Sequence, residues 1–264
     1  MRVVVLVKQV PDITSERSLG GDGLLLRTPT DAVLNELDEG ALETALRAAD
    51  ALGAELVAVT MGPEQASAAA RKALQVGAAL GIHVCDDALV GSDVVGTARA
   101  LAAAVSLLER EDPASPVALV VAGMSALDGL GSVVPALVAA ELGWPVASFA
   151  AEVTVEAGGD EAATVRITRE TEHGSERLRA ALPAVVSVTD TIAALRVPSF
   201  ATMLAARKAT LRTLTIADLG LEPAQVGLVG ARAVVGEAAP RPQRPPVQVV
   251  TDTGQAGEAL VDFL

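Results

Sequence analysis

The sequence predicts an α/β fold with a doubly wound, mostly parallel sheet, helices on both faces, an added β-hairpin and an extended C-terminal arm. Short apolar runs alternate with helical segments up to residue 145, which is the pattern of βαβ units. One run, 117–122, leads into a glycine-rich loop and then a helix. Beyond residue 145 a hairpin pattern begins, and the chain later becomes rich in proline.

The composition indicates a folded protein with a large core and excludes several partners. The chain has 264 residues, of which 51% are hydrophobic and 20% charged. Its net charge of −13 argues against binding to nucleic acid or to an anionic membrane surface. No uninterrupted apolar segment is long enough for a transmembrane helix, so we expect no membrane insertion. Cys85 is the single cysteine, which excludes an internal disulfide and favours a cytoplasmic protein.

The elements of the first half follow from hydrophobic period and capping residues. Acidic residues after Asn35 suit the first turn of a helix that Asn35 caps, and Gly62-Pro63 separates a strand from the next helix. A long loop at 13–33 carries a small hairpin signal at 20–23. The predicted strands are 2–7, 55–61, 81–84 and 117–122, and the predicted helices are 35–52, 63–76, 92–111 and 133–142. This order describes a Rossmann-like domain.

The second half adds a hairpin and an arm. Residues 149–155 and 164–168 flank a turn at 156–161, and 176–181 adds a strand. Residues 182–188 form the last clear strand, which we expect to return to the main sheet, and Val197 to Phe200 lead into a short helix, 201–209. We therefore divide the chain into an α/β domain, a segment with a short helix and a C-terminal arm ending in a helix from Gly254 to Leu264. Their ranges are 1–190 (including the hairpin at 149–181), 191–235 and 236–264.

The loop after residue 122 is the main candidate site. Glycines let the backbone approach a ligand, and the free N–H groups of the following helix attract an anion. Ser132 is the expected N-cap of that helix, and Gly143 ends it. The loop lacks the lysine of a P-loop and the third glycine of G-x-G-x-x-G. Many parallel α/β proteins have such a glycine and no ligand, so a purely structural role stays open.

Four segments together resemble the β subunit of electron transfer flavoprotein, and the similarity runs from Val3 to about Asp218. Each segment is weak by itself, but they occur in order and at the right spacing. They are Val7 to Asp12; Asn35 to Glu39 with Ala41, Glu43 and Ala45; Met61-Gly62-Pro63 through Arg71 to Ile82-His83-Val84; and Ile167 to Ser187 with Arg169, Glu172, Gly174, Glu176 and Leu178.

The resemblance implies a heterodimer with an α subunit. Such a pair carries electrons from flavin dehydrogenases to a membrane-bound quinone oxidoreductase. FAD is shared between the subunits and sits mainly on the α subunit. The β subunit is expected to bury an AMP with a structural role, and to catalyse nothing by itself.

The same resemblance implies the residues of the AMP site. They lie at the ends of predicted strands and the starts of predicted helices, where a doubly wound sheet binds its ligand. Asn35 serves adenine or caps its helix, and both alternatives stay open. The implied residues are Leu6, Asn35, Glu36, Leu37, Asp38, Met61, Gly123, Met124, Ser125, Ala126, Leu127, Asp128, Gly129, Leu130, Gly131, Ser132, Val133 and Val134.

The chain departs from the family pattern at this loop. Asp128 alone remains of an acidic set, and glycines and Ser132 replace the usual Gln-Thr-Gly. Side-chain donors are thereby lost and backbone donors gained. Two further departures are Ile13, at a place where an aromatic residue can lie near the flavin, and Ala193-Ala194-Leu195, where Asn-Glu-Pro is usual.

Phe200 is the candidate anchor for dehydrogenase partners, because the resemblance places the family's apolar recognition residue there. The alternative is a phenylalanine packed under its own helix. Cys85 and His83 suit structural roles, and we expect no metal site. Two other functions stay open: an independent adenine-nucleotide-binding enzyme such as an ATP pyrophosphatase, and a ligand-binding module without a redox role.

Overall fold

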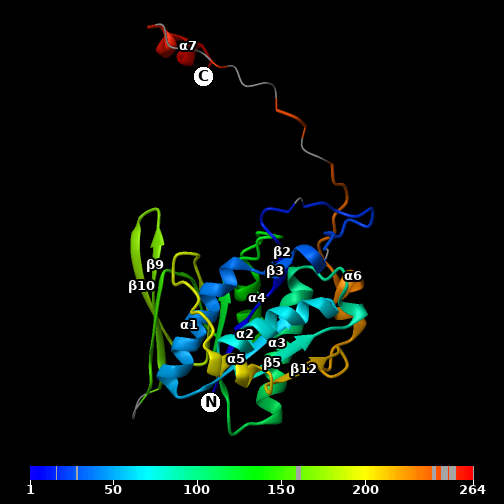
Figure 1. The fold of residues 1–264 in the computed structure, drawn as a ribbon, viewed down its shortest axis with the longest axis vertical. Helices are drawn as coiled ribbons and strands as arrows, with labels where there is room; N and C mark the ends of the chain where they lie inside the picture. Colours follow the sequence, from blue (N-terminus) through cyan, green and yellow to red (C-terminus); the bar gives the residue numbers. More distant parts are fainter. Residues whose placement is uncertain are drawn as a thin grey trace.

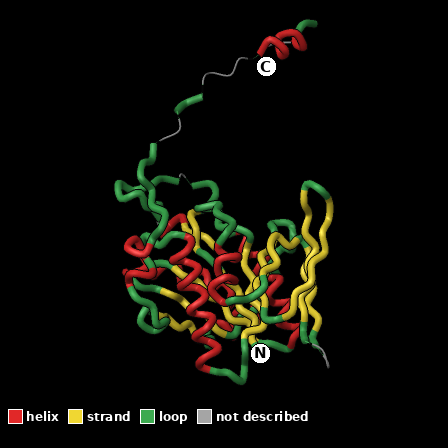
Figure 2. The backbone as a smooth tube through the Cα atoms, turned by 180° about the vertical axis from the view of Figure 1, so that it is seen from behind, coloured by secondary structure: helices red, strands yellow, loops and turns green. Residues whose placement is uncertain are grey.

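The computed structural model shows a central sheet with helices on both faces, and it confirms the predicted fold class (Figure 1). Viewed from behind, the strands lie between layers of helices (Figure 2). The structure describes the chain except for residues 16, 28, 159–161, 240–241, 245–248, 250–253 and 264.

Seven strands form the central sheet in the order β12-β5-β4-β1-β6-β11-β7, and every neighbouring pair is parallel. The innermost strands are nearly continuous apolar runs because helices cover both faces. The strands are β1 (Arg2–Leu6), β4 (Glu55–Met61), β5 (Leu80–Val84), β6 (Val117–Gly123), β7 (Val146–Ala150), β11 (Ala184–Val188) and β12 (Thr210–Leu214).

Helices divide the core between the two faces of the sheet. In β1, Val3 and Val5 face the core beneath the first two helices, whereas Val4 and Leu6 face the third and fourth. The alternation of side chains along a strand produces this division. The helices are α1 (Glu36–Leu52), α2 (Ser67–Val76), α3 (Val94–Glu111), α4 (Val134–Leu142), α5 (Phe200–Ala206), α6 (Gly227–Gly230) and α7 (Ala256–Phe263).

A three-stranded antiparallel sheet packs beside α1 and confirms the predicted hairpin. It consists of β8 (Glu152–Glu156), β9 (Thr164–Thr171) and β10 (Gly174–Ala181). Its inner face contributes Val165 and Ile167 to the core that contains α1 and α2. The turn at 159–161 lies outside the described residues.

One expectation about the strands is wrong, and one strand was not predicted. Residues 149–155 are not one strand, because β7 ends at Ala150, joins the central sheet beside β11, and is followed by β8. Phe149 there has a φ of 60°. The sequence also did not predict β12, which pairs with β5 at the sheet edge. Edge strands are half exposed, so β12 shows no continuous apolar run that would reveal it.

The N-terminal loop has more order than expected. β2 (Gln9–Pro11) and β3 (Ala32–Leu34) pair antiparallel at its base, and a bridge between Leu19 and Leu25 agrees with the predicted small hairpin. At the other end, α7 confirms a terminal helix, while the arm between α6 and α7 lies partly outside the described residues. No helix in the described part of the chain combines the length and apolarity needed to cross a bilayer.

Candidate functional site at the switch point of the sheet

The candidate site lies at the carboxyl edge of the sheet, between β1 and β6. From β1 the chain moves to β4 and β5 on one side, and then returns to β6 on the other side. This reversal opens a crevice outside the strand ends, where doubly wound folds bind ligands. Leu6 ends β1, Met61 ends β4 and Gly123 ends β6, so the structure brings these three predicted residues to one edge.

Asn35 holds the loop that follows β6. It occupies the predicted N-cap position of α1, but its side chain makes no capping hydrogen bond. Instead its amide donates to the carbonyl of Ser125 at 2.9 Å and accepts from the N–H of Leu127 at 3.1 Å. The side chain is fully buried. A residue at the start of one helix therefore fixes the path of a loop that lies ninety residues later.

Asp38 ties the end of β1 to the same place. Its carboxylate accepts a hydrogen bond from the main-chain N–H of Lys8 at 2.8 Å. Burial raises the pKa of Asp38 to about 7, although the Asn35 side chain and the Lys8 N–H oppose the rise by favouring the charged form. A carboxyl group that changes charge near neutrality thus sits beneath the loop.

Gly123 lets α1 approach the end of β6. A Cβ atom at this position would lie 2.5 Å from Oδ1 of Asp38 and 2.7 Å from the carbonyl oxygen of Leu37. The second contact is with backbone, which cannot rotate away. The predicted glycine is therefore required by packing, and the first turn of α1 lies directly against the strand end.

Asp128 is the charged centre of the loop. One carboxylate oxygen is 2.7 Å from Nζ of Lys8, and the other is 2.7 Å from a guanidinium nitrogen of Arg27. Burial opposes the charged form, but the two cations prevail and hold the pKa of Asp128 below its usual value. The sequence singled out Asp128 but missed both cations. Lys8 follows β1 directly, which was a usable signal, whereas nothing in the sequence joins Arg27 to a residue 101 positions away.

The second half of the loop presents its backbone to solvent. Leu130 and Ser132 have φ values of 49° and 53°, a left-handed backbone conformation that residues other than glycine rarely adopt. Ser132 is therefore not the N-cap of α4, because that position belongs to Val133. Among the described residues, nothing accepts a hydrogen bond from the N–H groups of Gly131, Ser132, Val133 and Val134.

Two further observations show that the loop suits a small polar ligand. The hydroxyl of Ser125 is buried and has no hydrogen-bond partner among the described residues, a state that costs free energy unless another group satisfies it. A Cβ atom built on Gly129 would meet nothing within 4 Å, so there is open space beside the backbone. The residues fit a group that offers both hydrogen-bonding atoms and negative charge.

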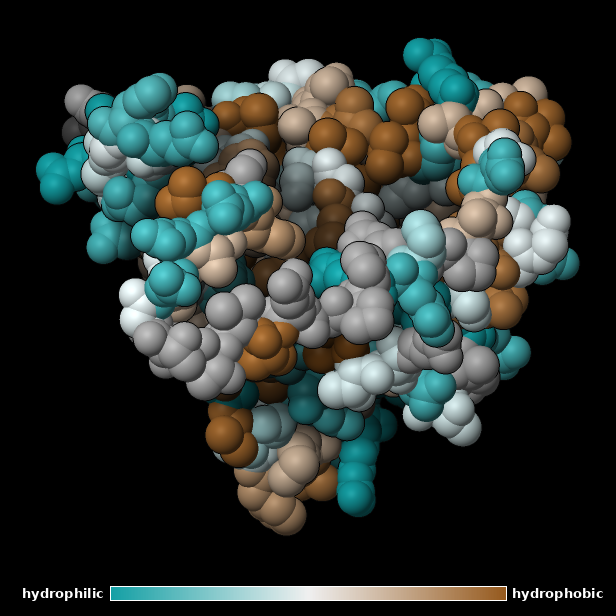
Figure 3. Space-filling model, turned by 90° about the horizontal axis from the view of Figure 1, so that it is seen from above, coloured by the Kyte–Doolittle hydropathy of each residue, from teal (hydrophilic) through white to brown (hydrophobic). Residues whose placement is uncertain are grey.

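The surface around the loop combines polar and apolar groups. Viewed from above, onto the carboxyl edge, brown apolar residues lie next to teal polar residues (Figure 3). Leu130 and Val133 of the loop are exposed, as are Leu228 and Val229 of α6. We call residues 123–134 the nucleotide loop, after the ligand proposed for it in the next subsection, and two of its own apolar side chains are uncovered.

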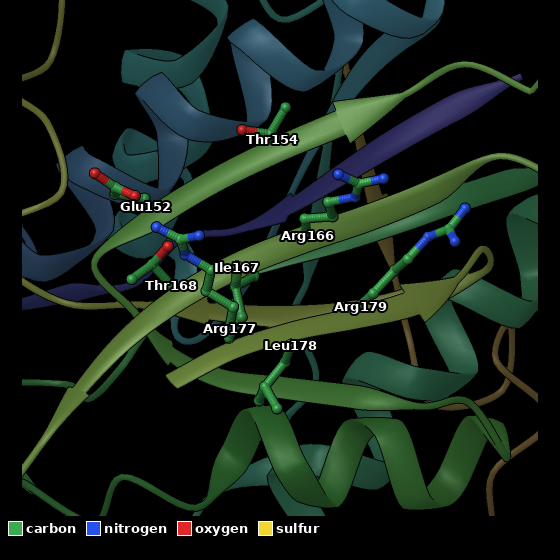
Figure 4. Close-up of a pocket in the computed structure, with 8 residues that line it drawn as sticks. All are labelled: Glu152, Thr154, Arg166, Ile167, Thr168, Arg177, Leu178 and Arg179. Carbon is green, nitrogen blue, oxygen red and sulfur yellow. The ribbon is translucent and has the colours of Figure 1, made fainter. Parts of the chain in front are cut away.

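An open hollow of about 370 Å³ lies elsewhere, on the β8–β10 sheet. Arg166, Arg177 and Arg179 line it together with Glu152 and Thr154 (Figure 4). It shares no lining residue with the nucleotide loop. We place the candidate site at the switch point, because the buried polar groups and unpaired backbone donors lie there.

Phe200 is well separated in sequence from this site. It begins α5 and is 79% exposed, so the alternative that it packs under its own helix is wrong. Ser199 caps the helix by accepting from the N–H of Thr202. Ahead of it, the side chain of Arg196 makes two hydrogen bonds to the buried carboxylate of Glu43 in α1. The same helix that begins at the nucleotide loop therefore also holds the segment before Phe200.

The electron transfer flavoprotein domain family matches residues 23–219. The chain belongs to the electron transfer flavoprotein family. It is 42% identical over 270 residues to the electron transfer flavoprotein subunit beta of Mycobacterium tuberculosis, covering 99% of this chain and 97% of that relative.

More distant relatives agree. The chain is 33% identical to protein FixA of Rhizobium meliloti, over 89% of this chain and 80% of the relative. It is 29% identical to the electron transfer flavoprotein subunit beta of Megasphaera elsdenii, over 99% of this chain and 96% of the relative. These similarities confirm the resemblance predicted from the four segments. The roles of the nucleotide loop in AMP binding and of Phe200 in docking stay predictions.

Proposed function

We propose that the chain is the β subunit of a heterodimeric electron transfer flavoprotein. With an α subunit it would accept electrons from flavin dehydrogenases and pass them to a membrane-bound quinone oxidoreductase. The support is the family match over residues 23–219 and the β subunits among its relatives. The pair is expected to act as a carrier in the cytoplasm, and the chain to catalyse no reaction by itself.

FAD, held mainly by the α subunit, would supply the ring that takes up and releases electrons. This chain would cover the flavin and exclude water with its exposed apolar surface at the carboxyl edge. Leu130, Val133 and Leu228 are the side chains available for that contact. Burial of such a surface in an obligate interface is favourable.

The observation that carries the AMP proposal is the run of unpaired N–H groups from Gly131 to Val134 at the start of α4, among the described residues. Successive backbone donors at a helix start hold phosphate well. The unpaired hydroxyl of Ser125 offers a further hydrogen bond. Leu6 and Met61, at neighbouring strand ends, provide apolar surface that suits a base.

The decisive experiment is to co-express the chain with its α subunit and to analyse the denatured pair by absorbance and mass spectrometry. We expect a yellow complex that releases both FAD and AMP. FAD without AMP in an active pair would reject the nucleotide site. AMP without a partner or flavin would favour the other candidate, a stand-alone adenine-nucleotide-binding protein with no redox role.

A pair of variants tests the place of the phosphate. Gly131→Asp should put a carboxylate beside it and remove AMP from the purified complex. Gly131→Ala is the matched control: its Cβ would meet only Val94, at an ordinary 3.8 Å. The alanine variant should retain AMP. Equal loss in both variants would point to the backbone of the loop and not to charge.

A further inference from the structure

Three chain segments meet at the carboxylate of Asp128. Lys8 comes from the end of β1, Arg27 from the N-terminal excursion between β2 and β3, and Asp128 from the nucleotide loop. Each cation contacts a different oxygen at 2.7 Å. Lys8 also donates its main-chain N–H to Asp38, so its position is fixed on both sides.

The burial of the three partners is unequal. The Asp128 side chain is 1% exposed, whereas those of Lys8 and Arg27 are 37% and 36% exposed. A buried carboxylate needs its cations, and loss of one partner is costly because the charge remains without compensation. The cations, in contrast, lie at the surface and can move into solvent. Asp128 is therefore the fixed half of the contact, and Arg27 is the movable half.

Arg27 joins a lightly attached segment to the body of the protein. The excursion is closed at its base by the β2–β3 pair and by a bond from the N–H of Asp12 to the carbonyl of Asp31. Its described hydrogen bonds between those points are mostly internal, such as the one from Gly20 to Leu24. The ion pair of Arg27 is different, because it reaches the nucleotide loop.

We propose that Lys8, Arg27 and Asp128 form a latch that holds the N-terminal excursion against the nucleotide loop and sets the rate at which AMP leaves. This inference rests on the proposed AMP site and adds a contact that controls how fast AMP leaves it. With the latch closed, Asp128 fixes the first half of the loop, and the backbone donors of the second half stay in place. Opening needs only the withdrawal of the exposed Arg27 side chain.

The test is the AMP dissociation rate of the purified αβ complex, measured by dilution into excess isotope-labelled AMP and mass spectrometry. Arg27→Met should speed release about tenfold, the effect of losing one charge-assisted hydrogen bond. Arg27→Lys keeps the charge and should release AMP more slowly than the methionine variant. Higher ionic strength should speed release from the wild type more than from Arg27→Met, since salt screens exposed ion pairs.

Arg212→Met is the matched control. Arg212 pairs with Glu111 at 2.6 Å, and its exposure of 39% is close to that of Arg27, but both partners lie away from the nucleotide loop. This variant should release AMP at the wild-type rate. A double-mutant cycle of Arg27→Met and Asp128→Asn should show coupling, because the two residues act through one contact.

The outcomes separate the latch from the proposed function. Wild-type complex with no AMP would overturn both. Complex that contains AMP, and that releases it equally fast from Arg27→Met, Arg212→Met and the wild type, would overturn the latch alone. Faster release from Arg27→Met with no coupling to Asp128 would also overturn it, because Arg27 would then act through a different contact.

Discussion

Two neighbouring strands of the sheet, β6 and β11, lead into segments of opposite character, and α1 fastens both. After β6, the Asn35 side chain at the start of α1 holds the nucleotide loop through buried polar contacts at Ser125 and Leu127. After β11, Glu43 of α1 holds Arg196, and the chain then exposes Phe200. The first segment offers backbone donors, which suit an anion, and the second an apolar side chain, which suits a protein surface.

The difference shows how one helix can position two segments of opposite character. The first turn of α1 lies against the end of β6, where Gly123 leaves no space for a side chain. One turn later, Gly40 packs somewhat less tightly against the segment after β11, because a Cβ atom there would lie 2.9 Å from the side chain of Ile192 and 3.3 Å from the carbonyl oxygen of Ala193. A glycine at each contact thus sets the distance between α1 and the segment, and polar residues fix the direction.

Gly123→Ala should give the largest effect, and it should disturb the contact between α1 and the nucleotide loop after β6. The added Cβ would overlap the Leu37 carbonyl oxygen and Asp38, so we expect a loss of about 3 kcal/mol in stability. The measurement is thermal melting of the αβ complex together with its AMP content. Gly129→Ala, where a Cβ has free space, is the control. Equal melting temperatures for the two variants would contradict the packing argument.

Phe200→Ala should weaken the binding of dehydrogenase partners without affecting the nucleotide loop. A buried interface anchor is worth about 2 kcal/mol, or about thirtyfold in affinity. Reduction of the flavin by a partner dehydrogenase should weaken by this factor, whereas reduction by dithionite, AMP content and melting temperature should not change. Met203→Ala on the same helix, where the side chain is less exposed than Phe200, is the control. Loss of flavin or stability would show that Phe200 belongs to the subunit interface.

Arg196→Met should loosen the segment between β11 and α5 and leave the nucleotide loop unchanged. It removes two side-chain hydrogen bonds to buried Glu43, worth about 1.5 to 3 kcal/mol for a charged group. Hydrogen exchange should speed up in α5 but not in α4. Arg47→Met removes a different partner of the same carboxylate, at 2.8 Å, and should leave exchange in α5 unchanged. Similar exchange in both variants would mean that Arg196 does not position the segment.

The smallest effect is a pH dependence of stability that arises from Asp38, beneath the nucleotide loop. The pKa of Asp38 rises from 3.8 to about 7 on folding, so the stability that its neutral form supports is complete below 3.8 and is lost as the pH rises through 7. Between about pH 6 and pH 8 the loss is about 1.4 kcal/mol. Asp38→Asn should flatten this slope in unfolding measurements. A variant with the wild-type slope would assign the dependence to another group.

Sequence reasoning succeeded where the signal was local. The strand at 117–122 and the C-terminal glycine of α4 both follow from residues next to one another, and the structure has both of them. It failed where a distant contact decided the outcome. Asn35 is a good capping residue, yet its amide forms hydrogen bonds with the backbone of the loop after β6.

By itself the sequence determined the fold class, the order of most elements and the position of the nucleotide loop, because hydrophobic period and glycine placement are properties of neighbouring residues. Only the tertiary structure decided which side chains surround that loop. Lys8, Arg27 and Asp128 lie in three separate segments. The place of Lys8 directly after β1 was a local signal, but nothing in the sequence joins Arg27 to Asp128. The crossover from β5 back to β6 brings the ends of β1 and β6 together, and this topology creates the charged contact.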